Sequence, residues 1–489
     1  MSSRGHAILA ALLVLIASAR IVSIYTTLSH TMDEPEHLGC GMRWISGKYD
    51  WDPAHPPMAR VMAATAVYLA GEHPRPAPSS HAEGVLMLGR DDHYDRMLAI
   101  ARFGVLPLFW IASVAVYWWA RRVGGPMAAV IAVFLFTTIP PVLAHAGLVT
   151  TDMACTAFGA MTFVVSLWWA ERPDRLRTVV FGVALGLAAV SKFSLLAFLP
   201  AAWVLLLVWY RPKVRVHVRP LIGAAVIGAI VIAAAYRFTM IPDFFAGIQG
   251  LIDHNTAGHA SYILGERHRI GVWYFFPVVL AVKTPLALLV LFAISLWQAR
   301  RKRLPVAAPL AFVVGILMVA MMGRINIGVR HVLPIYTAMS VICAVAAADI
   351  MRGHLVRTSG MFLLFASQAF SGAVQHPDYI AYTNELAYMH PERVVAESDL
   401  DWGQDMKLVA DFLRSHGATS VAFTPYSSSY LDTGRAFPRT TPADWYKPSP
   451  GWNVVSLSGL KVYRHPGWAE RMPPQFRIGR THWAYYFPP

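Results

Sequence analysis

Four residues that can exchange protons follow directly on a long apolar run near the start of the chain. The run covers residues 7–28, and Asp33, Glu34, Glu36 and His37 come shortly after it. Such a run can cross a bilayer, so these side chains are expected where the membrane meets water. A carboxylate there can act as a general base toward a hydroxyl group. The residues fit a helix start equally well, with Asp33 as N-cap and Glu36 as third residue.

A second acid, Asp152, begins another predicted helix on the same side of the membrane as Asp33. Helix capping alone would explain a carboxylate at this position. Two carboxylates that face each other could instead hold a metal ion through oxygen ligands, or divide the roles of base and positioning group. The residues leave these alternatives open.

Several basic residues are predicted to lie on the side of these acids. His55 and Arg60 belong to a stretch in which Pro56 and Pro57 precede a predicted amphipathic helix at residues 58–70. The others are Lys192, Lys283, Arg324, Arg330 and His331. Cations that converge at headgroup depth suit a lipid phosphate, although each one alone could equally be an anchor that reaches for the interface.

The composition is that of an integral membrane protein. Of 489 residues, 56% are hydrophobic and 14% are charged, with a mean hydropathy of +0.45, whereas soluble domains average about 25% charged. The net charge of +14 comes from short basic clusters between apolar runs, which is typical of topology signals and not of nucleic-acid binding. Three cysteines predict no disulfide framework.

The apolar runs predict about eleven transmembrane helices. They lie near residues 7–28, 98–120, 127–145, 153–170, 179–190, 193–210, 221–238, 272–297, 306–323, 332–350 and 360–374. Basic loops such as 121–122, 211–219 and 300–303 place the N-terminus inside. The long first loop, 29–97, and the segment after residue 375 are then both outside.

This pattern predicts two domains: a transmembrane domain at 1–375, whose first loop carries interfacial helices, and a small extracytoplasmic α/β domain at 376–489. In the second domain, apolar spacing predicts a helix at 405–416 that ends at Gly417. Segments 420–424, 453–457 and 461–464 are predicted strands. The acids of the run 399–401 are interpreted as helix-flanking residues and not as metal ligands. Because the chain has no nucleotide-binding or zinc-peptidase motif, no nucleotide is expected.

The chain resembles the GT-C class of integral-membrane glycosyltransferases, in the phospholipid-carrier-dependent branch of protein O-mannosyltransferases and aminoarabinose transferases. Four motifs carry this resemblance, and two further runs support it. The motifs are residues 33–37, 55–60, 151–152 and 399–406, and the runs are 324–334 and 376–379. Together they span nearly the whole chain.

The resemblance implies a GT-C fold and transfer of a sugar from a polyprenyl-phosphate donor to an acceptor hydroxyl or amine on the outer face, with inversion. It implies that Asp33 is the catalytic base with Glu34 beside it, and that Asp152 is a second outer acid. His55 and Arg60 then lie near the donor phosphate. Relatives often have Lys where this chain has Arg60, and the two side chains differ in geometry.

The expected partners are the lipid-linked donor, a protein, glycan or lipid acceptor, and membrane lipid, without nucleic acid. The expected location is the inner (plasma) membrane, with the site on the extracytoplasmic side, and a divalent cation is left open. The alternative function is a transporter or lipid-linked sugar flippase. Internal repeats and midplane charges are typical of transporters, whereas the acids here gather on one side.

Overall fold

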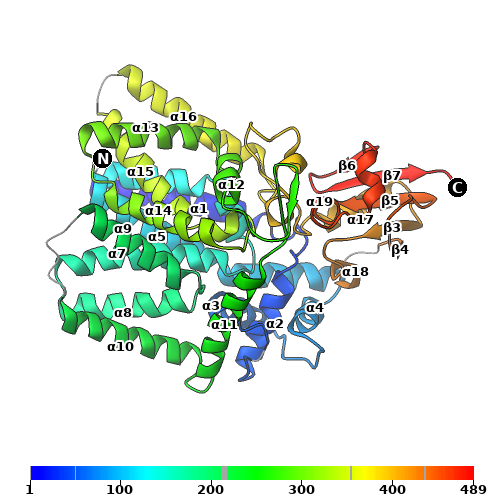
Figure 1. The fold of residues 1–489 in the computed structure, drawn as a ribbon, viewed down its shortest axis with the longest axis horizontal. Coiled ribbons are helices and arrows are strands. Elements are labelled where there is room, and N and C mark those ends of the chain that lie inside the picture. Colours follow the sequence, from blue (N-terminus) through cyan, green and yellow to red (C-terminus); the bar gives the residue numbers. More distant parts are fainter. Residues whose placement is uncertain (1, 50, 211–216, 353–354, 434–436) are drawn as a thin grey trace.

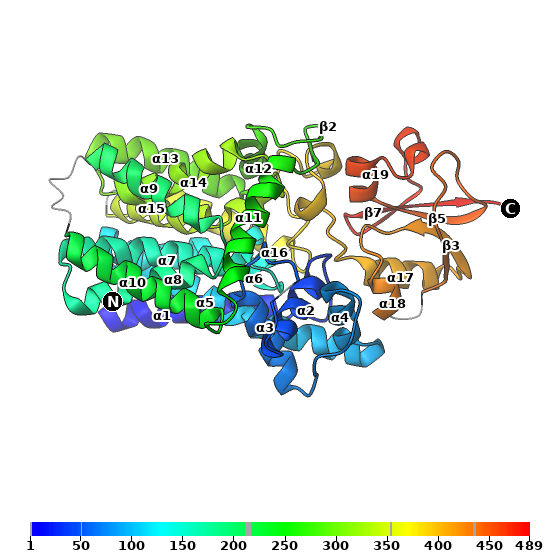
Figure 2. The same cartoon turned by 60° about the horizontal axis from the view of Figure 1, so that its bottom comes forward.

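A helical body makes up most of the molecule, and a small sheet lies at one end of it (Figures 1 and 2). The computed structural model describes residues 2–49, 51–210, 217–352, 355–433 and 437–489. Part of the basic loop used to predict the topology, residues 211–216, lies outside the described residues. The apolar helices make the chain a multi-pass membrane protein.

The helical body follows the predicted apolar runs. Its long helices are α1 (Ser3–Val22), α5 (Asp91–Thr137), α7 (Asp152–Glu171), α8 (Arg175–Ala189), α9 (Leu195–Tyr210), α10 (Val218–Ala235), α11 (Ile241–Ala257), α13 (Leu286–Lys302), α14 (Ala307–Met322), α15 (Ile335–Ile350) and α16 (Leu355–Val374). Shorter helices are α2 (Glu34–Ile45), α3 (Met58–Leu69), α4 (Ser80–Leu88), α6 (Pro140–Ala146), α12 (Phe275–Lys283) and the 3₁₀ turn η1 (Val329–Val332).

The structure supports fewer membrane crossings than the sequence pattern predicts. Within the described residues, four helices are long and apolar enough to cross a bilayer: α1, α5, α7 and α10. A fifth crossing results if the bent pair α12 and α13 counts as one. Helices α9, α14 and α15 are apolar but only 16 residues long. The predicted count of about eleven is therefore not confirmed.

Two breaks explain part of the difference. Helix α5 contains two helical segments, because Gly125 adopts φ 84° and interrupts them between the second and third predicted spans. The span predicted over 272–297 is broken into two helices, since α12 and α13 meet at an angle of 113°. Thr284 is extended there and Pro285 follows it, as expected for a residue that precedes proline.

Helices α2, α3 and α4 form a tight cluster beside the body (Figure 2). Helix α3 confirms the helix predicted at 58–70. Glycines let α2 approach its neighbours closely: a Cβ at Gly41 would lie 2.1 Å from the carbonyl oxygen of Arg60, and one at Gly39 would lie 1.9 Å from that of Ser80. This packing places the start of α2, which carries the first acidic motif, against α3 and α4.

The C-terminal region contains α17 (Met406–Ser415), α19 (Leu457–Tyr463) and a five-stranded sheet. Its strands are β3 (Ser420–Thr424), β4 (Arg439–Thr441), β5 (Gly451–Ser456), β6 (Phe476–Ile478) and β7 (His482–Phe487), in the order β4-β3-β5-β7-β6. Strand β3 pairs parallel with β4 and β5, and β7 pairs antiparallel with β5 and β6. The predicted helix at 405–416 and the first two predicted strands are confirmed.

The third predicted strand, 461–464, is wrong because these residues belong to helix α19 and its C-cap. The Ser456 hydroxyl accepts a hydrogen bond from the Gly459 N–H and caps that helix, and the sheet takes β7 as the neighbour of β5 instead. A single apolar turn after a strand has too few residues for its periodicity to distinguish helix from strand. The division of the chain at residue 375 stays a prediction.

Candidate active site

Asp33 forms an ion pair at the edge of a polar cavity. It occupies the N-cap position of α2 but makes no capping hydrogen bond through its side chain. Instead, Arg330 Nη1 donates to Asp33 Oδ2 at 2.8 Å, and the Arg330 guanidinium stacks 4.1 Å from the Trp402 ring centre. Burial would lower the pKa of Arg330, but the charges of Asp33 and Asp152 raise it above its usual value. Asp33 therefore faces a permanent cation.

Glu34 pairs with a different cation, Arg102, and is buried. Its carboxylate accepts hydrogen bonds from Arg102 Nε at 2.9 Å and Nη2 at 2.7 Å, and from the backbone N–H groups of Thr31 and Val149 at 2.8 and 3.0 Å. Burial alone would raise the pKa of Glu34, but Arg102 and the two N–H groups lower it below the usual value. One buried carboxylate thus joins the segment before α2 to the segment before α7.

Asp152, the first residue of α7, pairs with a second cation. Lys192 Nζ donates to Asp152 Oδ1 at 2.5 Å, and His145 Nδ1 lies 3.9 Å from Oδ2. In the described part of the chain, Asp152 Oδ2 and His145 Nδ1 are buried without a hydrogen-bond partner. The second predicted acid therefore keeps one free oxygen.

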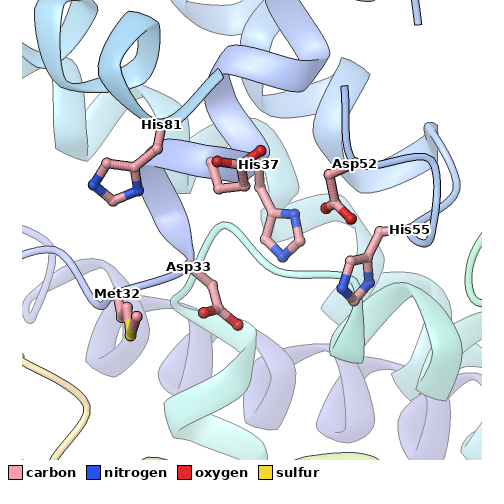
Figure 3. Close-up of a pocket in the computed structure, with 7 residues that line it drawn as sticks. Met32, Asp33, His37, Asp52, His55 and His81 are labelled. Atoms are coloured by element: carbon pink, nitrogen blue, oxygen red, sulfur yellow. The ribbon is translucent and has the colours of Figure 1, made fainter. Parts of the chain in front are cut away.

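The polar cavity has a volume of about 230 Å³ and lies beside the start of α2 (Figure 3). It is lined by Met32, Asp33, Glu36, His37, Asp52, His55 and His81. Figure 3 shows the rings of His37 and His55 on the same side as the Asp33 carboxylate, and the two ring centres are 5.1 Å apart. Three carboxylates and three imidazoles can bind a ligand rich in hydroxyl groups.

A second cavity, of about 340 Å³, is mostly apolar. Its lining comes from α9, α11, α14 and the segment around η1: Ser194, Ala197, Phe198, Leu251, Ile252, Asn255, Thr256, Val319, Met322, Gly323, Ile325 and His331. The two cavities are linked along the chain, because Arg330 pairs with Asp33 of the polar cavity and the next residue, His331, lines the apolar one.

Some of the residues predicted to bind phosphate do not line either cavity. Arg60 is completely buried, and its guanidinium donates to His37, Tyr49, Asp52 and the carbonyl oxygen of His55. Lys283 is buried and donates to the carbonyl oxygens of Ile380 and Asp399. Neither residue lines the two cavities.

Arg324 lies on the surface next to the apolar cavity, where its backbone N–H donates to Asn255 Oδ1. Its neighbours Gly323 and Ile325 line that cavity. The structure therefore pairs Lys192 and Arg330 with the two acids and places His331 in the wall of the apolar cavity, whereas Arg60, Lys283 and Arg324 contact neither acid.

The C-terminal motif 399–406 makes hydrogen bonds to the residues that directly precede Asp33 and Arg330. The Met32 N–H donates to the Trp402 carbonyl oxygen at 3.0 Å, directly before Asp33. The carboxylate of Asp399 accepts from the backbone of Val329, directly before Arg330. Asp401 accepts from the Ser456 hydroxyl. Both acids of the 399–401 run are thus engaged in contacts that order the chain.

One group of side chains could hold a cation. Single ligand atoms of Glu36, Cys40 and Asp52 lie within 4.8 Å of one another. Arg60 already pairs with Asp52, and Ser80 donates its hydroxyl to Glu36. This guanidinium puts positive charge where a cation would bind, so we assign no metal to this group.

Several residues of the site were not among the predicted site residues, and three of them make contacts that matter for the predicted ones. Arg102, His37 and Trp402 each contact a predicted residue or line its cavity. A sequence signal existed for Arg102, because it is a charged residue inside a predicted span. His37 and Trp402 lie in motifs that were recognised as a whole, but the motifs do not show which member faces the cavity.

The ring of His55 should not make anion binding depend on pH between about 5 and 8. Burial, helped by Arg60 and Lys192, lowers the pKa of His55 to about 3, so its ring stays neutral throughout this interval. An ordinary histidine would gain charge below about pH 6.5 and would strengthen the binding of an anion as the pH falls. We therefore expect the Kd of a phosphate diester to vary with pH in His55→Gln as it does in the wild type. A tenfold drop in Kd between pH 8 and pH 5 that His55→Gln abolishes would contradict the neutral ring.

Part of the chain matches a known protein family. Residues 10–242 match the family model described as dolichyl-phosphate-mannose-protein mannosyltransferase. That stretch contains Asp33, Asp152 and Lys192. No relative was found among curated protein sequences.

Solved structures match over most of the chain. ArnT from Cupriavidus metallidurans bound to undecaprenyl phosphate is 15% identical, with 97% of both chains covered and a TM-score of 0.57. Its apo state gives 14% identity, 97% coverage of both chains and a TM-score of 0.55. The archaeal oligosaccharyltransferase AglB from Archaeoglobus fulgidus, in complex with an inhibitory peptide and a dolichol-phosphate, is 15% identical over 90% of this chain and 62% of its own, with a TM-score of 0.52.

These likenesses show the fold, and residues 10–242 match a family of mannosyltransferases, which are glycosyltransferases. Asp33 and Asp152, the acids of the two ion pairs, both fall within the matched region. The protein is a membrane glycosyltransferase with the GT-C fold.

Proposed function

We propose that this enzyme transfers a sugar from a polyprenyl-phosphate donor to a hydroxyl or amine of an acceptor at the outer face of the membrane, with inversion at the anomeric carbon. One observation carries the proposal: Arg330 pairs with Asp33, which lines the polar cavity, and is followed in the chain by His331, which lines the apolar cavity. A lipid-linked sugar has the matching order of parts, with a polar sugar, an anionic phosphate and an apolar tail.

The cations provide the phosphate site in this proposal. Arg330 presents a planar guanidinium, which suits the oxygens of a phosphate, and Lys192 adds a second charge beside Asp152. His331 is neighbour to Arg330 and lines the apolar cavity, which would take the first isoprene units of the carrier. The sugar would then occupy the polar cavity beside Asp33.

The chemistry follows from these charges. Asp33 accepts the proton of the acceptor hydroxyl while the acceptor oxygen attacks the anomeric carbon. The bond from that carbon to the phosphate oxygen breaks, and Arg330 and Lys192 stabilise the leaving phosphate. Because Arg330 can serve the phosphate instead of Asp33, donor binding would release the carboxylate for its role as a base.

Three of the other predicted site residues act in this proposal by positioning. Glu34 fixes the segments that carry Asp33 and Asp152, and Lys283 ties α12 to the C-terminal motif through backbone carbonyls. Arg60 holds the loop of His55. A transporter or flippase is not proposed, because the family match is to glycosyltransferases.

We place the enzyme in the inner membrane, with the site and the C-terminal region on the extracytoplasmic side, as the basic loops of the sequence predict. Mass spectrometry of envelope glycans, lipids and glycoproteins, with and without the gene, tests the function and identifies the acceptor. We expect one sugar modification to disappear and to return with the wild-type gene but not with Asp33→Asn. An unchanged envelope under conditions in which the gene is expressed would contradict the proposal.

A further inference from the structure

His37 has one committed and one free ring nitrogen. Arg60 Nε, which always carries a proton, donates to His37 Nδ1 at 2.9 Å. Nδ1 must therefore accept, so the neutral ring carries its proton on Nε2. Burial, together with the charge of Arg60, holds the pKa of His37 well below its usual value, and the ring stays neutral. The contact with Arg60 thus fixes which nitrogen is the donor.

The free donor faces the polar cavity. In the part of the chain that the structure describes, Nε2 of His37 has no hydrogen-bond partner, although only 3% of the residue is exposed. His37 lines the cavity, and Figure 3 shows its ring between the side chains of Asp33 and His55. An oxygen of a ligand in the cavity could therefore accept a hydrogen bond from this N–H.

The contacts of Arg60 keep the His37 ring in this tautomer. It is completely buried, and besides His37 it donates to the Tyr49 hydroxyl, to the carbonyl oxygens of Asp52 and His55, and to the Asp52 carboxylate. These contacts fix the guanidinium in one orientation, and they use every nitrogen of the group. Arg60 therefore has its effect on a ligand through His37.

We propose that His37 is a substrate-binding residue whose Nε2–H donates to an oxygen of the lipid-linked donor, and that Arg60 is the positioning residue that fixes this tautomer. The inference rests on the proposed function and adds to it a neutral hydrogen-bond donor beside the catalytic base. The accepting oxygen belongs either to the phosphate or to a sugar hydroxyl, since both offer the same chemistry. A neutral donor can bind either one without adding a charge next to Asp33.

Two substitutions of His37 separate the two nitrogens. In His37→Asn the amide can still accept from Arg60, but the side chain is too short to reach the position of Nε2. In His37→Gln the amide nitrogen reaches that position and can donate. The same change at an exposed histidine of the first loop, His73→Asn, is the matched control. Thermal unfolding midpoints show whether each variant is folded.

Binding of undecaprenyl phosphate and the KM for an undecaprenyl-phosphate-linked sugar distinguish the two sources of oxygen. If the phosphate accepts, His37→Asn weakens undecaprenyl phosphate binding about tenfold or more. If a sugar hydroxyl accepts, binding of undecaprenyl phosphate is unchanged and the KM for the loaded donor rises about three- to tenfold. In both cases His37→Gln restores most of the loss and kcat changes less than KM.

Unchanged Kd and KM in His37→Asn, with a wild-type enzyme that binds and uses the donor, would overturn the inference and leave the proposed function standing. A wild-type enzyme that neither binds undecaprenyl phosphate nor uses the loaded donor would instead overturn the proposed function, and this inference with it. Nitrogen NMR of ¹⁵N-histidine-labelled protein gives a test that needs no variant to fold: a proton on Nδ1 of His37 would also overturn the inference.

Discussion

Asp33→Asn should slow sugar transfer by about 10²- to 10⁴-fold, the usual contribution of a general base. The amide is nearly the same size as the carboxylate but cannot take the acceptor proton. Donor binding should be preserved or tighter, because Arg330 loses its anionic partner and becomes free for the phosphate. Initial rates at saturating donor, together with the Kd for undecaprenyl phosphate, measure the two effects separately.

Asp253→Asn is the matched control for this substitution, since Asp253 lies exposed on α11 and contacts Gln249. Its transfer rate should stay within about twofold of the wild type, as expected for a surface change. A rate for Asp33→Asn that equals the control would remove Asp33 from the role of base.

Glu34→Gln should cost about 3–5 kcal/mol of folding free energy, because it leaves Arg102 as a buried charge without its partner. Both side chains are 1% exposed, and the pair is 2.7 Å long. The same carboxylate holds the backbone before Asp33 and before Asp152, so surviving enzyme should also transfer more slowly. The unfolding midpoint in detergent, followed by circular dichroism, gives the stability effect.

Two further variants show whether the lost stability comes from the buried ion pair. Glu266→Gln, at a side chain that is 75% exposed, should leave the midpoint unchanged. Replacing Glu34 and Arg102 together by Met should recover part of the stability, because an apolar pair leaves no unpaired charge. Should Glu34→Gln melt like Glu266→Gln, the buried ion pair would not have the structural role assigned to it.

The fold was predictable where the physical signal is local. Continuous apolar runs gave helices such as α8 and α14 close to their observed bounds, since lipid and core both select apolar residues. The bend between α12 and α13 was missed because hydropathy does not register direction. Pro285 was the available signal, but a proline in a long apolar run permits either a kink or a complete break.

The sequence predicted which residues belong to the candidate site better than it predicted which of them contact one another. The topology placed Asp33, Asp152, Lys192 and Arg330 on one side of the membrane, and the structure joins them in two ion pairs. Arg60 shows what sequence could not give: its motif suggested a phosphate ligand, whereas its guanidinium is buried in protein contacts. Burial of one side chain depends on packing between α2 and α3, which no local pattern encodes.

The most direct test of the central claim uses the purified enzyme in lipid nanodiscs with undecaprenyl-phosphate-linked sugar, labelled in the sugar, and a cell-envelope extract as acceptor. The proposal predicts that wild-type enzyme moves the label into an acceptor and releases undecaprenyl phosphate in equal amount, and that Asp33→Asn binds the donor without turnover. Wild-type enzyme that binds the donor but leaves its sugar–phosphate bond intact in the presence of every acceptor fraction would contradict it.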